Sequence, residues 1–239
     1  MYAFTQHRPA TVRQAASLLA KEEEAKLLAG GHTLIPTMKL RLAGPKHLVD
    51  LSKVDGLTGI EMKGRSLIIG AMTPHVDVQT SPVVKENIPA LADLAGKIGD
   101  PAVRHRGTIG GSIANNDPNA DYPAAVLGLG ATIITKVQFP KVNKAAYVKF
   151  PNPASRYALV GVFVSKRSSE IRVVVTGAGA NGVFRVSAFE QALKKRFGAK
   201  SLEGLTVPAD GMASDIHGSA EYRAHLVGVL ARRAVAAAG

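Results

Sequence analysis

The sequence predicts an α+β fold. Patterns typical of helices and of strands follow one another irregularly along the 239 residues, without the strand–helix–strand rhythm of a doubly wound parallel sheet. The composition is 46% hydrophobic and 20% charged, which is typical of a globular protein. Residues 1–135 carry a net charge of +2, and residues 136–239 carry +10 of the total +12. This shift, together with nearby prolines, predicts a domain boundary near residues 141–153.

The first hundred residues contain short candidate elements. Thr11 is a typical N-cap residue and begins a helix that reaches the Glu22-Glu23-Glu24 cluster. The other expected elements are strands at 26–29 and 47–51, a helix at 34–42, a hairpin of strands 57–62 and 66–71, and a single helix at 83–98.

Residues 99–121 are poor in periodicity and are expected to form a long loop. Loops of this length without structure of their own are uncommon and are often functional. Asp121 is placed to cap a buried helix over residues 122–130, and strands are expected at 131–135 and 136–139. Beyond the boundary we expect paired strands at 157–166 and 171–177, a basic helix at 189–197, a polar linker at 210–219 and a terminal helix at 221–238.

The composition excludes several classes of chemistry. The sequence has no cysteine, which excludes disulfides, a thiolate-held iron–sulfur cluster and a cysteine nucleophile. No apolar run reaches the ~18–20 residues of a membrane span. The N-terminus has no apolar signal segment, so the sequence favours the cytoplasm.

The positive charge raises the alternative of a basic nucleic-acid-binding module. Against that alternative, the positive half has no RNA-recognition or helix-turn-helix signature, and aromatic residues make up only 5% of the chain. We therefore expect no nucleic-acid partner.

Two glycine-rich segments suggest a binding site. The first segment follows a predicted strand, and the second lies in the expected loop. They consist of Ala29, Gly30, Gly31, His32 and Thr33, and of Thr108, Ile109, Gly110, Gly111 and Ser112. Glycines let the backbone approach a ligand closely, and unpaired N–H groups beside a helix start attract anions. Two such segments, one on each side of a ligand, suit a diphosphate.

The alternative for each segment is an ordinary structural turn. Neither segment is G-x-G-x-x-G, and neither carries the Gly-Lys-Ser/Thr of a P-loop. The Asn and Asp residues at 115–121 suit sugar hydroxyls, or else form Asx-turns before the next helix. The seven histidines show no metal-ligand spacing, and only His32 lies where it would meet a ligand. We expect no catalytic acid–base pair, which favours a cofactor that supplies its own chemistry.

Both glycine segments resemble the FAD-pyrophosphate motifs of the flavoprotein subunits of molybdenum hydroxylases. The resemblance covers nearly the whole chain and includes residues 98–104 before the second motif, residues 115–118 and 121–124 after it, and residues 152–160 and 220–226. The C-terminal half is most similar to the medium subunit of aerobic carbon monoxide dehydrogenase.

The resemblance implies two FAD-binding subdomains of the PCMH type, similar to vanillyl-alcohol oxidase, at residues 1–52 and 53–141. It also implies a C-terminal carbon monoxide dehydrogenase flavoprotein-type domain at 142–239, with a three-stranded sheet and a helix bundle. The two glycine segments would hold the FAD pyrophosphate, and Gly99 and Asn115 would join that site. Asp121 would lie near the ribityl or ribose hydroxyls, and Tyr157 against the isoalloxazine ring. The alternative for Tyr157 is a core aromatic at the start of a strand.

The resemblance further implies partners. A large subunit would carry the molybdenum cofactor and oxidise CO with water to CO2, and a small subunit would carry [2Fe-2S] clusters, in a dimer of heterotrimers. Electrons would pass through the clusters to FAD on this chain and then to a quinone or another acceptor. A complex of this kind would stay in the cytoplasm, with peripheral association with the inner face of the cell membrane as an option. A purine, N-heterocycle or aldehyde hydroxylase is the alternative within the family, and a docking subunit without flavin is a third reading.

The sequence departs from the family near residues 133–136. Family members carry a few tens of residues between the strands that here lie at 130–133 and 134–140. In this sequence the two strands abut without turn residues. We therefore expect that the native protein contains a segment absent here and is heavier than 25.0 kDa.

Overall fold

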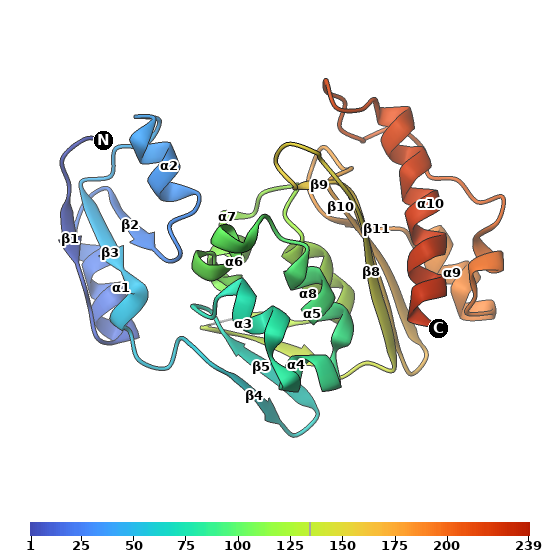
Figure 1. Ribbon diagram of the computed structural model, residues 1–239, viewed down its shortest axis with the longest axis horizontal. Coiled ribbons are helices and arrows are strands. Elements are labelled where there is room, and N and C mark those ends of the chain that lie inside the picture. The colour runs from blue at the N-terminus through green and yellow to red at the C-terminus, as the bar shows by residue number, and fades with distance from the viewer. Residues whose placement is uncertain (134) are drawn as a thin grey trace.

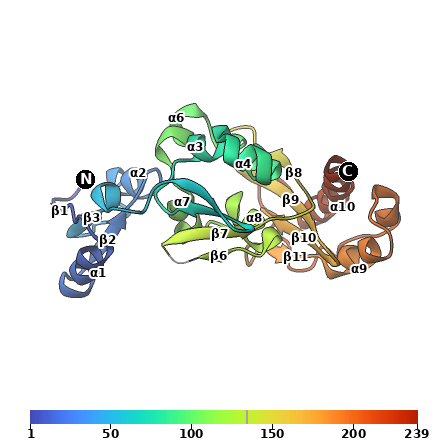
Figure 2. The same cartoon turned by 90° about the horizontal axis from the view of Figure 1, so that it is seen from below.

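The computed structural model describes residues 1–133 and 135–239. Three sheets follow one another along the chain and lie in a row, with the N-terminal sheet at one end and the C-terminal helices at the other (Figures 1 and 2). The strands of the three sheets fall within residues 5–50, 60–140 and 144–185. The domain limits at residues 52 and 141 stay a prediction.

The N-terminal sheet has three parallel strands in the order β1-β3-β2. Its elements are β1 (Thr5–His7), α1 (Val12–Lys21), β2 (Ala25–Leu28), α2 (Leu34–Lys39), β3 (His47–Asp50) and a 3-10 turn (Leu51–Lys53). Thr11 caps α1 through a capping box with Gln14, as its residue type predicts.

The central sheet is antiparallel in the order β4-β5-β7-β6, and six helices are inserted between β5 and β6. The strands are β4 (Ile60–Lys63), β5 (Ser66–Gly70), β6 (Thr132–Ile133) and β7 (Lys136–Pro140). The helices are α3 (His75–Thr80), α4 (Pro82–Asn87), α5 (Pro89–Gly96), α6 (Pro101–Arg106), α7 (Ile109–Asn115) and α8 (Tyr122–Leu129). The strands β6 and β7 pair as a hairpin. Residue 134, where the absent segment was expected, lies outside the described residues.

Two expectations for this region are wrong. The single helix expected at 83–98 is divided into α4 and α5, because Pro89 has no N–H and forces Ile88 out of the helical region. The loop expected at 99–121 contains α6 and α7. Their N-caps are Asp100 and Thr108, whose side chains accept hydrogen bonds from Val103 N and Gly111 N at 2.9 and 3.1 Å. With six and seven residues, these helices are too short to show a helical period.

The C-terminal sheet is antiparallel in the order β11-β10-β9-β8. Its elements are β8 (Lys144–Pro151), β9 (Ala158–Arg167), β10 (Glu170–Thr176), β11 (Phe184–Arg185), α9 (Ser187–Lys195), a 3-10 turn (Ala199–Leu202) and α10 (Ala220–Ala238). Three long strands form it, as expected, and the two-residue β11 extends its edge. The sheet lies between α5 and α8 on one face and α10 on the other (Figure 1). Strand β9 is therefore buried on both faces, with Phe163 in one core and Val162 and Val164 in the other.

None of the helices in the described part of the chain combines the length and apolar character that crossing a bilayer requires.

Candidate functional site

A cavity of about 1220 Å³ lies where the three sheet units meet. It is larger than the ~300–1,000 Å³ typical of small-molecule pockets, so it has room for a dinucleotide. Its walls come from the β2–α2 segment, the start of α3, the α6–α7 segment and the turn before β9. Of the fourteen residues expected at the site, thirteen line this cavity.

The exception is Ile109. Its side chain is fully buried in the core of the central unit and does not line the cavity. The Ile109 side chain therefore does not reach a ligand in the cavity, and the place of this residue at the cofactor site stays a prediction. As the first residue of α7, it points toward the core while its glycine neighbours face the cavity.

The first glycine segment presents its backbone to the cavity. In the described chain, the N–H groups of residues 30–33 have no hydrogen-bond acceptor. Gly31 has φ of +77°, a conformation that favours glycine. At Gly30 a Cβ atom would lie 2.1 Å from Arg106 O, so this glycine packs against the backbone that leads into the second glycine segment. Four successive amides without an acceptor, in a segment that lines the cavity, are donors available to phosphate oxygens.

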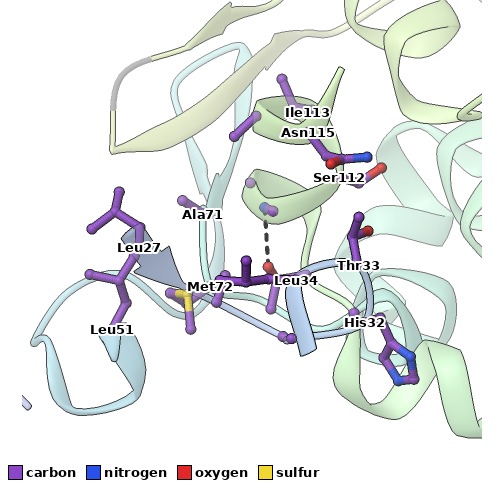
Figure 3. Close-up of a pocket in the computed structure, with 18 of the residues that line it drawn as sticks. Leu27, His32, Thr33, Leu34, Leu51, Ala71, Met72, Ser112, Ile113 and Asn115 are labelled. Atoms are coloured by element: carbon purple, nitrogen blue, oxygen red, sulfur yellow. Dashed lines mark hydrogen bonds between the residues drawn. The ribbon is translucent and has the colours of Figure 1, made fainter. Parts of the chain in front are cut away.

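The second glycine segment is built differently from the expectation. Its amides are already paired within the chain: Gly110 N donates to Ala71 O, Gly111 N to Thr108 Oγ1 and Ser112 N to Thr108 O. A Cβ on Gly110 would meet Ala71 O at 2.6 Å, so glycine permits close packing here. The side chains of Thr33 and Ser112 both line the cavity and lie on the same side of the view in Figure 3. This second segment therefore offers the Ser112 hydroxyl to a ligand rather than backbone amides.

The part of the cavity wall farthest from Thr33 and Ser112 in Figure 3 is apolar. Leu27, Leu51 and Met72 gather there, away from Thr33 and Ser112 (Figure 3). The cavity thus combines an anion-binding centre with an apolar end, which suits a ligand that has a diphosphate between two flat ring systems.

Asp121 is the N-cap residue of α8, as expected, but its side chain does not cap the helix. Its side chain makes no capping hydrogen bond and is buried, because it accepts from Tyr147 Oη at 2.5 Å and from Lys149 Nζ at 2.9 Å. Burial raises the pKa of the Asp121 carboxyl above its usual range, and the Lys149 ammonium opposes that shift. Asp121 nevertheless lines the cavity.

Tyr157 lies at the cavity wall formed by residues 155–157. The residue is 42% exposed, which rejects the alternative of a core aromatic. Asn152 Oδ1 accepts from the N–H groups of Ala154 and Ser155 and so shapes the turn before Tyr157. Partial burial, with the nearby Asp117 and Asp121 charges, raises the pKa of Tyr157.

His75 is a cavity residue that the sequence analysis missed. It is 4% exposed, and its Nδ1 atom has no hydrogen-bond partner in the described structure. Burial, with the nearby His32 and Arg104 charges, lowers the pKa of His75 to about 4, so the ring is neutral at pH 7. No sequence signal identifies it, because Thr73 and Pro74 place His75 at the start of a short helix that has no motif. Among the described residues, no three acidic, histidine or cysteine side chains come together as a metal site.

Comparison with known proteins shows the family to which this chain belongs. A family model for the FAD binding domain in molybdopterin dehydrogenase matches residues 2–145. The carbon monoxide dehydrogenase medium chain of Hydrogenophaga pseudoflava is 32% identical, over 98% of this chain and 96% of that protein. The nicotine 6-hydroxylase medium subunit of Paenarthrobacter nicotinovorans is 33% identical, over 97% and 95%.

A solved structure agrees with these matches. A chain of the H. pseudoflava carbon monoxide dehydrogenase that lacks the Mo-pyranopterin moiety superposes with a TM-score of 0.87 at 33% identity, covering 99% of this chain and 97% of that one. The fold and cavity define an FAD-binding oxidoreductase subunit. The chain belongs to the FAD-binding medium subunits of the molybdenum hydroxylases.

The same comparison bears on the chain length. The alignment with the H. pseudoflava medium chain extends over 277 positions, whereas this chain has 239 residues, so at least 38 positions have no counterpart here. Both chains are covered almost completely, so these positions are internal.

The residues present fit FAD. The amides of residues 30–33 suit the pyrophosphate, and the apolar end of the cavity suits a flat ring. Gly30 and Gly110 allow close backbone packing beside the pyrophosphate position, because a Cβ atom at either would clash with backbone. Three aliphatic and thioether side chains at that end offer contact to a flat ring without demanding hydrogen bonds.

Proposed function

We propose that the cavity holds FAD with its pyrophosphate on the amides of residues 30–33 and the Ser112 hydroxyl. The observation that carries this proposal is the run of four amides without an acceptor, which belong to a cavity-lining segment packed against the backbone just before the second glycine segment. Asp121 would accept hydrogen bonds from ribityl hydroxyls, and Tyr157 would lie against the isoalloxazine ring. When bound, FAD supplies the electron-accepting chemistry, while this chain binds, orients and shields it.

A comparison of flavins tests this assignment. Titration of the purified chain with FAD and with FMN measures how much the adenylate half contributes to affinity. We expect FAD to bind much more tightly than FMN, because FMN cannot reach both the amides of 30–33 and the apolar end. Ser112→Ala should weaken FAD binding. Equal affinity of the wild-type chain for the two flavins would contradict the placement.

We propose further that the chain is the electron-transfer subunit of an aerobic carbon monoxide dehydrogenase. In that complex a large subunit carries the molybdenum cofactor, and a small subunit carries [2Fe-2S] clusters and passes electrons to FAD. A quinone or another acceptor then receives them. The absence of cysteine in this chain supports the division, because thiolate-held clusters must then lie on a partner. The proposed location is the cytoplasm.

The second candidate is the same role in a hydroxylase of heterocycles or aldehydes. The nicotine 6-hydroxylase medium subunit is as similar to this chain as the carbon monoxide dehydrogenase medium chain is. Purification of the native complex and identification of its subunits by mass spectrometry, followed by assays with CO, N-heterocycles and aldehydes, separates the candidates. Turnover of heterocycles without turnover of CO would reject the first.

A further inference from the structure

A buried ion pair stands behind the cavity wall. Lys149 Nζ lies 2.9 Å from Asp121 Oδ2, and the two side chains are 3% and 4% exposed. Tyr147, two residues earlier on β8 and also buried, donates its hydroxyl to Asp121 Oδ1. Asp121 lines the cavity, whereas neither Tyr147 nor Lys149 does. The two donors therefore reach the cavity only through the carboxylate that they hold.

The same ammonium fixes a second part of the wall. Lys149 Nζ also donates to Lys97 O at 2.9 Å, and Lys97 Nζ donates to Tyr147 O at 3.1 Å. Lys97 directly precedes Ile98 and Gly99, which line the cavity. One strand of the C-terminal sheet thus ties Asp121 and the segment 97–99 together.

This arrangement is costly as a purely structural device. Taking two charges out of water costs several kcal/mol per ion, and an apolar replacement of similar volume is often as stable or more stable. Asp121 has about four lone-pair positions, of which Tyr147 and Lys149 occupy two. The carboxylate can therefore still accept hydrogen bonds from hydroxyl groups on the cavity side.

We propose that Lys149 and Tyr147 are positioning residues of the cofactor site, which hold Asp121 as an oriented carboxylate locked to the segment 97–99. The inference rests on the proposed placement of FAD. It predicts that FAD affinity depends on two side chains that FAD never touches.

The pH dependence of FAD affinity distinguishes a positioning role of Tyr147 and Lys149 from a purely structural one. A purely structural role would leave this pH dependence unchanged. The charged and titratable groups around Asp121 are Lys149 and Tyr147 on β8, Lys97 after α5, Tyr122 on α8, and Tyr157. Protonation of Asp121 at low pH breaks the pair and weakens FAD binding. Because the Tyr147 hydroxyl helps to keep the pKa of Asp121 down, its removal should move the acid limb of FAD affinity to higher pH.

The decisive comparison is Tyr147→Phe against Tyr122→Phe in the full chain, with FAD titrated between pH 5 and pH 8. Both tyrosines are fully buried, but the Tyr122 hydroxyl has no partner in the described structure. We expect Tyr147→Phe to weaken FAD about tenfold at pH 7, as for loss of a hydrogen bond to a charged group, and to shift the acid limb upward. Tyr122→Phe should leave affinity and profile unchanged.

Lysine variants extend the test. Lys149→Met should weaken FAD further, and Lys149→Arg should restore part of the affinity. If Lys149→Met does not fold, the double variant Asp121→Asn/Lys149→Met removes both charges and should fold, while binding FAD weakly and without an acid limb. Lys144→Met, on the exposed start of the same strand, is the control.

Two failures are distinguishable. A wild-type chain that does not bind FAD would reject the proposed function itself. A wild-type chain that binds FAD, with Tyr147→Phe matching Tyr122→Phe in both affinity and pH profile, would reject the positioning role and leave the proposed function standing.

Discussion

Gly30 is the residue at which the first glycine segment packs against Arg106 and Gly107, directly before the second segment. A methyl group there would lie 2.1 Å from Arg106 O and 2.9 Å from Gly107 Cα, so backbone would have to move. Overpacking of this kind costs about 1–3 kcal/mol. We expect Gly30→Ala to push the amides of residues 30–33 away from the backbone at residues 106–107 and to weaken FAD binding about tenfold or more.

Gly198 provides the control for this prediction. Gly198 has open space where its Cβ would lie and an extended backbone, so Gly198→Ala should be tolerated. Fluorescence titration of FAD into the two variants compares them directly. Equal affinities would show that the close approach at Gly30 has no part in binding.

His75 should make the stability of the protein depend on pH. Its folded pKa is about 4 against a usual value of 6.5, because burial disfavours the charged ring. The unfolded chain therefore takes up a proton that the folded chain refuses. The stability contributed above pH 6.5 is lost as the pH falls toward about 4, by up to about 3 kcal/mol.

The variant His75→Leu should remove this part of the pH dependence. Urea unfolding at pH 7 and pH 5 measures it, with His225→Leu on the exposed face of α10 as the control. The loss of stability between the two pH values should be smaller in His75→Leu than in wild type or in the control. An identical loss in all three proteins would contradict a neutral, buried His75.

At the scale of elements, α7 presents the second glycine segment. Thr108 caps this helix through Gly111 N, and Ser219 caps α10 in the same way through Tyr222 N. Replacing either residue by alanine removes an N-cap worth about 1 kcal/mol. We expect similar falls in melting temperature for Thr108→Ala and Ser219→Ala, but weaker FAD binding only for Thr108→Ala. Unchanged FAD affinity in Thr108→Ala would show that the start of α7 does not shape the site.

Elements with strong patterns could be predicted from the sequence, and short elements could not. Residues 158–167 and 170–176 form paired strands as expected, because a buried sheet requires apolar residues over its whole length. The helices α6 and α7 were not predicted, because six or seven residues are too few for a repeated apolar spacing to be recognised. Their N-cap residues, Asp100 and Thr108, gave no further signal, since aspartate and threonine are also common in loops.

The candidate site also contains residues that could be predicted from the sequence and residues that could not. The glycine segments were predictable because glycine has a local, physical role at close approaches. The Lys149–Asp121 pair and His75 were not, since their roles depend on burial created by distant strands and helices. The sequence placed Asp121 at the site but predicted that its side chain caps a helix, whereas it forms a buried ion pair. Aspartate occurs in both positions, so its residue type alone does not separate them.

At the scale of the whole molecule, one cavity has walls from all three sheet units. A ligand bound there adds its binding free energy to the stability of the assembled fold, about 2.7 kcal/mol at one hundred times its dissociation constant. We expect FAD to raise the melting temperature in a concentration-dependent way and to protect the connection between residues 51 and 59 from proteolysis. FMN should do less of both, and equal protection by FMN would contradict a cavity filled along its length.

The length of the chain is a second whole-molecule prediction. The H. pseudoflava relative has internal positions without counterpart here, and their place near residues 133–136 stays a prediction. Intact mass spectrometry of the native protein should then give more than 25.0 kDa. A native mass of 25.0 kDa would show that the short β6–β7 connection belongs to the protein itself.

The central claim is that this chain holds FAD in the cavity between its glycine segments. The most direct measurement is the absorbance spectrum of the purified protein, followed by denaturation and quantification of the released flavin. The account predicts a yellow protein that releases one FAD per chain and a Gly30→Ala variant that retains less flavin. A colourless protein that does not bind added FAD, alone or in its native complex, would contradict the account.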